Sequence, residues 1–552
     1  MTFGRPVLAT HGPGWGPLGQ PARWAMGVLL VIALAVVANL ARLELGAWSS
    51  EAIQVDELFF AACAARGNAT GELPVPGCHD NKAPIIFLVH QLVQLGAGTY
   101  ELGAMKVVAY AVVAVLAVQL AILARHLGGW PAALAAPALM LLTLSNDANL
   151  FALKTETVGT AFILAAMTLW IVAKDEIGAG RWFAIGVCFG LATMTKQTYA
   201  VAGVAVIVHR MFVAVLVRDG RYGQVIRDVL ACGVGMALPL LAFLAWFSIR
   251  GGWAEFLGNL VIYPSVYGTD SDAPTWQRLT WTVSAMMETF SRAPLVPALF
   301  ASALVFHWWP RAAGVDWRAF AQSPTTVLSL VIGVLLLVLA AAPAFFRFHV
   351  LPVWILASLL AGVLVAHVLT YGTRVDARCS AALCTALLAF AVLMAHSSVS
   401  TRGGRSQGFE RHSDPARWTA KDREGSYAYV HGVWPYFYAH NKLVPASNVM
   451  FPWALPGVPA KYVYRAPPTG SWRARLLHWA QQQSAKQLQQ DFKKTPPHSI
   501  LVAHDIARAP GSLRISDVEV LDDYIKSNCE FSRMVIEKGL KTSVYHCRVP
   551  GK

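Results

Sequence analysis

The most constraining feature of this sequence is a series of long apolar segments. Several of them reach the roughly 20 residues that an α-helix needs to cross a bilayer. Hydrophobic residues make up 56% of the chain and charged residues only 14%, against about 25% in a soluble domain. The sequence therefore predicts an α-helical polytopic membrane protein. Its transmembrane helices, about eleven of them, are expected near residues 24–46, 102–125, 130–145, 155–173, 182–196, 198–217, 228–249, 293–309, 325–343, 348–370 and 379–397.

Basic residues between these segments indicate which side of the membrane each loop faces. Residues 1–23 are rich in Gly and Pro and predict a disordered cytoplasmic arm, followed by an uncleaved first helix. Alternation from there places arginines such as Arg218, Arg221 and Arg227 in cytoplasmic loops, as the positive-inside rule requires. Six other cations fall on the outer side, so the charge bias alone is weak. The net charge of +14 is then explained by contact with membrane lipids rather than nucleic acid, because no zinc-finger, Walker or Rossmann pattern is present.

Two polar segments fall outside the membrane in this topology. The first outer loop covers residues 48–100 of a transmembrane domain that we place at 24–397. The chain then becomes polar from Ser398 onward. In the segment 398–552, YAYVHGVW and SVYHCRV are typical of strands, and RARLLHWAQQQSAKQLQQDF is typical of an amphipathic helix. We expect this segment to form an extracytoplasmic α/β domain.

The cysteines in these outer segments come in pairs. Cys63 and Cys78 lie in the first outer loop, and Cys529 and Cys547 lie in the C-terminal segment. The other four cysteines fall in the apolar segments or at their ends. Disulfides form in oxidising compartments, so an even pair in each outer segment predicts one disulfide in each.

The first outer loop also places acidic residues beside apolar runs. Residues 55–66 (VDELFFAACAAR) and 81–95 (NKAPIIFLVHQLVQL) suit two helices lying along the membrane surface. On composition alone, Asp56 and Glu57 are most simply explained as the start of the first helix, since acids favour the first turn. A carboxylate partly shielded from water is also a candidate general base.

A group of cations falls at the outer ends of the predicted helices. For any single member, a long side chain reaching the membrane interface is the simpler explanation. As a group, these cations could line an outer cavity that holds a phosphate. They are Lys82, Lys154, Lys196, Arg278, Arg292 and Arg347.

The order of several motifs resembles the membrane glycosyltransferases of the C superfamily (GT-C). This superfamily includes protein O-mannosyltransferases and the aminoarabinose transferases of lipid A. Its acidic motif in the first outer loop corresponds to VDEL, with Asp56 and Glu57, and its Lys-Pro-Pro-like motif corresponds to DNKAP, with Asp80 and Lys82. Ala83 stands where the family usually has its first Pro.

Further motifs extend the resemblance over nearly the whole chain. An acid that opens the fourth helix corresponds to ALKTETVGTAF, with Glu156. The family's run ending in Thr-Lys corresponds to GLATMTK, which ends at Lys196. The motif that opens a late helix corresponds to FRFHVLP, with Arg347 and His349. In the tail, YVHGVWPYFYAHNKLVPASNVMFPW is similar to a pattern of many bacterial members.

The resemblance implies a reaction and a set of site residues. A sugar would pass from a polyprenyl-phosphate donor to an envelope acceptor (a glycolipid such as lipopolysaccharide, a polysaccharide or a protein), with inversion, on the outer face of the inner (plasma) membrane. Asp56 would be the general base, and Glu57 and Glu156 would orient the acceptor or the sugar. The residues implied to bind the lipid phosphate and the sugar are Lys82, Asp80, Lys196, Arg347 and His349.

Two other classes of protein remain open at this stage. A transporter or flippase of lipid-linked sugars would share the helices and the outer cations. It would need polar residues deep in several helices, and it often carries an internal repeat, which this sequence lacks. A non-catalytic sensor would keep the outer domain but has no reason for acids at both the loop and the helix ends. The sequence names no cofactor and leaves a divalent metal open.

Overall fold

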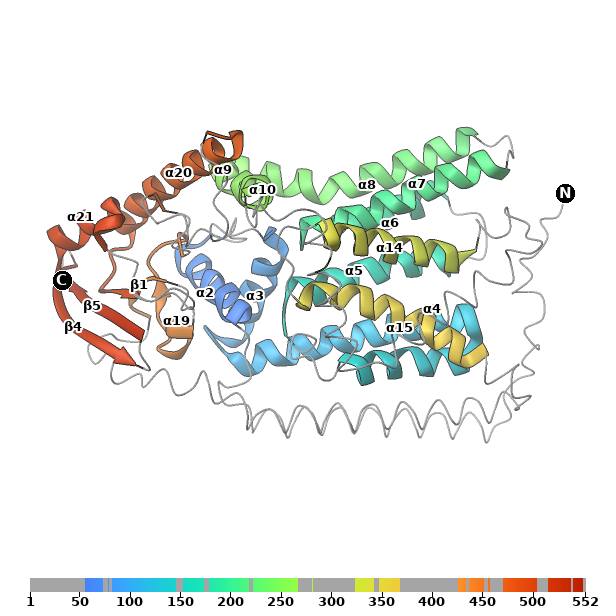
Figure 1. Cartoon of the computed structure of the whole chain (residues 1–552), viewed down its shortest axis with the longest axis horizontal. Helices are drawn as coiled ribbons and strands as arrows, with labels where there is room; N and C mark the ends of the chain where they lie inside the picture. Colours follow the sequence, from blue (N-terminus) through green and yellow to red (C-terminus); the bar gives the residue numbers. More distant parts are fainter. Residues whose placement is uncertain are drawn as a thin grey trace.

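Apolar helices occupy one end of the molecule and a small sheet occupies the other (Figure 1). The predicted arm 1–23 and the predicted helices 24–46, 293–309 and 379–397 lie outside the described residues. This computed structural model describes residues 55–72, 78, 82–144, 152–172, 178–217, 222–266, 280, 323–341, 347–367, 425–432, 436–450, 455–456, 470–503, 515–537 and 540–549.

The helical bundle follows the apolar segments of the sequence. Within the described part of the chain, three stretches are long and apolar enough to cross a membrane: Leu102–Leu141, Gln197–Leu216 and Tyr222–Ile249. The remaining bundle helices are apolar but shorter. The bundle contains α4 (Leu102–Leu144), α5 (Thr155–Ile171), α6 (Ala179–Thr193), α7 (Ala200–Val217), α8 (Tyr222–Ile249), α14 (Pro324–Ala341) and α15 (Leu351–His367).

A kink divides α4 at the point where the sequence predicted two helices. Gly129 has φ 75° and ψ −166°, which is not helical, and Pro131 follows it. Glycine accepts the positive φ without a steric penalty, and proline cannot donate the helical hydrogen bond. The predicted segments 102–125 and 130–145 are therefore two helices joined by this break.

The bundle has an apolar core and an apolar exterior. Buried leucines and alanines of α4, α5 and α15 form its core, with Trp354 among them. The outer faces of α7 and α8 expose Val208, Val215, Leu230 and Leu241. An exposed apolar surface of this kind is expected where lipid, rather than water, is the solvent.

The first outer loop forms two helices, as the sequence predicted. They are α2 (Val55–Thr70) and α3 (Pro84–Ala97). Proline favours the first helical position because its missing N–H has no intrahelical acceptor there, so α3 begins at Pro84. A disulfide joins Cys63 of α2 to Cys78, with their Cα atoms 6.0 Å apart. The Ile85 N–H donates to the Met194 carbonyl oxygen at 3.1 Å, which fixes α3 to the end of α6.

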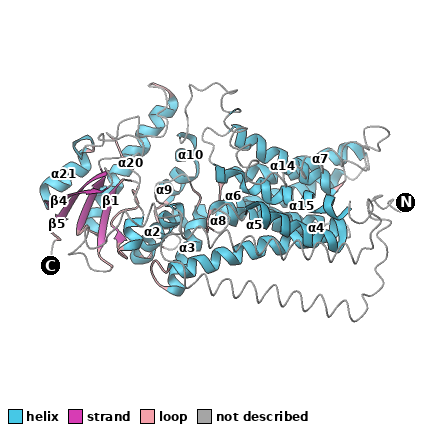
Figure 2. Cartoon of the chain, turned by 60° about the horizontal axis from the view of Figure 1, so that its bottom comes forward, coloured by secondary structure: helices cyan, strands magenta, loops and turns pink. Residues whose placement is uncertain are grey.

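The C-terminal segment forms a mixed five-stranded sheet with helices beside it (Figure 2). The strand order is β2-β1-β3-β5-β4. Pairs β1–β2 and β1–β3 are parallel, whereas β3–β5 and β4–β5 are antiparallel. Its elements are β1 (Tyr427–His431), α19 (Tyr436–His440), β2 (Val444–Pro445), α20 (Trp472–Lys494), β3 (Ser499–Ala503), α21 (Glu519–Asn528), β4 (Cys529–Glu537) and β5 (Leu540–Cys547).

Local chemistry explains two features of this domain. The Ser471 hydroxyl accepts the Ala474 N–H at 3.1 Å and caps the start of α20. Cys529 and Cys547 lie opposite each other in the β4–β5 pair, with Cα atoms 3.9 Å apart, and are joined by a disulfide. The two disulfides among the described residues are thus the two pairs predicted from the sequence.

Short helical turns connect these parts near the first outer loop. The segment after α8 contains α9, a π-helical turn and α10, while two 3₁₀ turns precede α7 and α15. Their bounds are α9 (Trp253–Leu257), η3 (Gly258–Ile262), α10 (Tyr263–Val266), η2 (Gln197–Tyr199) and η5 (Arg347–Val350), with η8 (Ile515–Asp517) in the C-terminal domain.

Helices α2 and α3 lie between the bundle and the sheet (Figure 1). Arg66 of α2 forms a buried salt bridge with Asp491 of α20, with Nη2 and Oδ1 3.0 Å apart. Its Nη1 also donates to the Pro445 carbonyl oxygen at 3.0 Å and to the Thr495 hydroxyl at 3.1 Å. The first outer loop is therefore bound to the C-terminal domain by charged and neutral hydrogen bonds.

Candidate active site

Charged side chains gather where the bundle meets α2 and α3. Asp56 and Glu57 come from the first turn of α2. Lys154 occupies the position just before the first turn of α5, and Glu156 lies in that turn. Lys196 follows the end of α6, in the short connection before η2. Three elements that are distant in the sequence thus bring their polar ends together.

Asp56 is the partly exposed acid of this group. Its Oδ2 lies 2.9 Å from Lys154 Nζ. The Asp56 side chain is 41% exposed, whereas that of Lys154 is 4% exposed. The carboxylate is therefore held by a buried cation on one side and is accessible on the other.

Glu57 is enclosed, although it is the next residue. Its side chain is 1% exposed, and its Oε2 lies 2.7 Å from Lys106 Nζ of α4. Its Oε1 accepts the Leu153 N–H at 2.8 Å. Both carboxylate oxygens thus bind the protein itself, so Glu57 fixes α2 against α4 and against the segment that precedes α5.

His90 of α3 supports the same segment. Its Nε2 lies 3.0 Å from the Leu153 carbonyl oxygen, which can only accept, so Nε2 carries the proton. Burial lowers the pKa of His90 to about 4, because desolvation disfavours the charged ring. The imidazole is therefore neutral at neutral pH and acts as a fixed hydrogen-bond donor.

Glu156 and Lys196 form the second ion pair of the site. Glu156 Oε1 lies 2.6 Å from Lys196 Nζ, with side chains 2% and 10% exposed. The Thr155 hydroxyl donates to Glu156 Oε2 at 2.9 Å. The charge of Lys154 also acts on Glu156. Both acids and both lysines thus belong to one connected electrostatic group.

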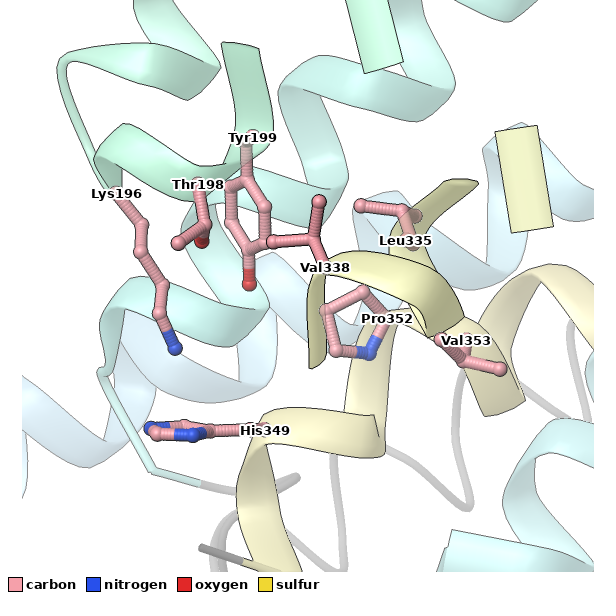
Figure 3. A pocket seen from close by; sticks show the side chains of 8 residues that line it. All are labelled: Lys196, Thr198, Tyr199, Leu335, Val338, His349, Pro352 and Val353. Carbon is pink, nitrogen blue, oxygen red and sulfur yellow. The ribbon is translucent and has the colours of Figure 1, made fainter. Parts of the chain in front are cut away.

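A pocket with one polar wall and one apolar wall opens beside this pair (Figure 3). In Figure 3, the ammonium of Lys196 extends toward the ring of His349, and the hydroxyl of Tyr199 points into the space between the walls. Apolar side chains close the other side. The lining residues are Lys196, Thr198, Tyr199, Leu335, Val338, His349, Pro352 and Val353. The pocket thus joins a cation and polar groups on one side to apolar side chains on the other.

The remaining predicted residues are described to different extents. The charge of Lys82 acts on both Lys196 and His349, which places it near the polar wall of the pocket. The backbone of Arg347 begins η5, the same turn that carries His349, but its side chain lies outside the described part. Asp80 also lies outside the described residues.

Some residues of the site were not identified as such from the sequence. The sequence places Lys154 among the outer cations, and its position two residues before Glu156 is the signal that links it to the site. Lys106 pairs with an acid 49 positions away, and Tyr199 lies three residues beyond the motif that ends at Lys196. Within the ranges that the structure describes, no three His, Cys, Asp or Glu side chains gather as a metal site would require.

Comparison with known proteins gives structural relatives only. No family model matches the sequence, and no curated protein matches it. The chain is similar to the crystal structure of ArnT from Cupriavidus metallidurans bound to undecaprenyl phosphate, at 11% identity and a TM-score of 0.61, covering 95% of this chain and 98% of that chain. The apo state of the same ArnT gives 12% identity and a TM-score of 0.57, with the same coverage.

A more distant likeness is to the apo oligosaccharyltransferase of Archaeoglobus fulgidus. The identity is 10% and the TM-score 0.47, covering 92% of this chain and 73% of that chain. The two ArnT structures, in contrast, match from one end of the chain to nearly the other. The chain therefore has the GT-C fold, that of an α-helical polytopic membrane protein with a C-terminal domain, as the order of its motifs predicted.

Proposed function

We propose that this protein is a GT-C glycosyltransferase that moves a sugar from a polyprenyl-phosphate donor to an acceptor of the cell envelope. The observation that carries the proposal is the pairing of a half-exposed carboxylate, Asp56, with the buried cation Lys154, near the second ion pair of Glu156 and Lys196 and its pocket of mixed polarity. The shared fold with an ArnT that binds undecaprenyl phosphate supports the choice of a lipid phosphate.

The polar wall of the pocket supplies what a lipid phosphate needs. Lys82 and Lys196 provide positive charge, and both cations also act on the neighbouring His349. Arg347 begins the turn that carries His349, and we assign its guanidinium to the phosphate as well, because its planar fork can bind two phosphate oxygens at once. The apolar wall, with Leu335 and Val353, would receive the first part of the prenyl chain.

The reaction is a single displacement at the anomeric carbon. Asp56 takes the proton of the acceptor hydroxyl, and the acceptor oxygen forms the new bond to the anomeric carbon. The bond from that carbon to the carrier phosphate breaks, and the phosphate leaves with the electron pair. Because base and leaving group lie on opposite faces of the sugar, the configuration inverts.

The acids divide their roles within this scheme. Glu156 stays beside Lys196 at the pocket and would orient the sugar or the acceptor. Glu57, which the resemblance grouped with it, has both oxygens bound to Lys106 and Leu153, so we now assign it a structural role. The active site and the C-terminal domain would face outward from the inner membrane, as alternation of the helices from a cytoplasmic amino terminus predicts.

The test is transfer by purified protein in nanodiscs. A panel of undecaprenyl-phosphate-linked hexoses and pentoses would be offered with envelope lipids, glycans and proteins, and released undecaprenyl phosphate would be measured by mass spectrometry. The variant Asp56→Asn should lower the rate about 10²–10⁴-fold, because it removes the general base. The exposed Glu101 provides the control, Glu101→Gln, which should transfer normally. Near-normal turnover by Asp56→Asn, or no release from any donor by the unaltered protein, would contradict the proposal.

A further inference from the structure

Lys154 is a buried cation that has no assigned role in the proposed displacement, although it contacts the proposed base. Its side chain is 4% exposed and its ammonium lies 2.9 Å from the carboxylate of Asp56. A buried ammonium is strongly disfavoured unless an anion lies beside it. Asp56 is half-exposed and would otherwise be free to change its rotamer toward water. The ion pair therefore restrains the acid much more than the exposure of that acid suggests.

Lys154 is itself held from several sides. The Leu153 N–H donates to Glu57, and the Leu153 carbonyl oxygen accepts from His90. The Lys154 N–H donates to the Thr157 hydroxyl at 3.4 Å, and that hydroxyl donates in turn to the Ala152 carbonyl oxygen at 3.0 Å. The backbone that carries the Lys154 ammonium is thus bound to α2, α3 and the first turn of α5.

We infer that Lys154 is a positioning residue that holds the carboxylate of Asp56 toward the acceptor side of the site, an inference that rests on the proposed function. The buried face of Asp56 binds the ammonium, and its exposed face is left for the acceptor hydroxyl. Once Asp56 has taken the proton of the acceptor, return of that proton to solvent restores the ion pair with Lys154 for the next turnover.

A competing role for Lys154 is direct binding of the donor phosphate. Its charge also acts on Glu156 and His349 at the pocket, so distance alone does not separate the two roles. They differ in what they predict. A phosphate ligand contributes to donor binding, whereas a positioning residue for the base acts through Asp56 and on the turnover step.

The experiment is a double-mutant cycle in nanodiscs, in which the rate of undecaprenyl phosphate release is measured as before. Lys154→Met should lower kcat about tenfold or more with little change in KM, and Lys154→Arg should restore most of the rate. Lys154→Met in an Asp56→Asn background should cause almost no further loss, because both changes remove one function. Lys154→Gln replaces Lys154→Met if the apolar variant does not fold.

The matched control is Lys106→Met, which removes the other buried lysine that pairs with an acid of α2. The fold losses of rate caused by Lys106→Met and Asp56→Asn should multiply in the double variant, since Lys106 acts through Glu57 and not through Asp56. Binding of undecaprenyl phosphate alone should be unchanged in Lys154→Met. Weakened binding in Lys154→Met, or multiplication with Asp56→Asn, would overturn this inference while the proposed function stands. If the unaltered protein transfers no sugar, the proposed function fails and this inference fails with it.

Discussion

Adjacent residues Asp56 and Glu57 have opposite surroundings, and helix geometry explains the difference. Successive residues of an α-helix point about 100° apart, so one side chain of the pair can face the site while the next faces the bundle. The sequence could identify both as acids at the start of α2. It could not tell that Glu57 is enclosed, because its partners Lys106 and Leu153 lie 49 and 96 positions away.

Glu57→Gln tests this division at the level of one residue. The change leaves the buried Lys106 ammonium without its anion, so we expect the free energy of unfolding to fall by about 3 kcal/mol. Denaturant unfolding in detergent measures this. The same change at Glu101, which is exposed, should leave stability unaltered. A Glu57→Gln variant that is as stable as the unaltered protein but has lost transfer would show that Glu57 acts on the substrate and not on the structure.

At the level of elements, apolar length predicted where the helices lie, and the structure explains how two of them approach. Helices α6 and α8 cross at glycines. A Cβ added at Gly186 would clash with the Cys232 carbonyl oxygen, and one added at Gly235 would clash with the Phe183 carbonyl oxygen. The sequence showed these glycines but not which face of each helix they occupy. The central strand β3 could likewise not be placed from the short apolar run at 499–503, because its partners β1 and β5 are distant in the sequence.

A pair of glycine variants on α8 should therefore have opposite effects. Gly235→Ala forces the two backbones apart and should lower stability by about 1–3 kcal/mol. Gly233→Ala, two residues away with nothing within 4 Å of the added Cβ, should be neutral or stabilise by up to roughly 1 kcal/mol through helix propensity. Unfolding of the two variants in the same detergent compares them directly. Equal effects would show that the crossing tolerates a methyl group.

At the level of the whole molecule, the first outer loop depends on the C-terminal domain. Asp491 binds Arg66 and also accepts from the Ser447 hydroxyl at 2.7 Å and the Asn448 N–H at 3.2 Å. The Tyr100 hydroxyl donates to the Leu443 carbonyl oxygen at 2.8 Å. The sequence motifs predicted the two domains separately. They could not predict the contacts between the domains, because a polar residue such as Arg66 or Tyr100 does not by itself indicate which distant residue it binds.

The buried pair between the domains provides the test at this scale. Arg66→Met should lower the free energy of unfolding by about 3–5 kcal/mol, because it leaves Asp491 buried with its charge unpaired. Arg66→Met combined with Asp491→Leu should recover part of that loss. Arg548 and Glu530 form an exposed pair, so Arg548→Met should have no measurable effect. If Arg66→Met lowers the free energy of unfolding no more than Arg548→Met does, then other contacts hold the two domains together.

The long sequence separation between Arg66 and its partners also sets the order in which parts of the protein can fold. Its partners Pro445 and Thr495 are made 379 and 429 positions later. At a synthesis rate of about 5–20 residues per second, α2 emerges roughly 20–90 s before the last of these partners exists. During that interval α2, which carries Asp56, lacks the contacts that fix it to the C-terminal domain. If the proposed function holds, we therefore expect an unfinished chain to be inactive.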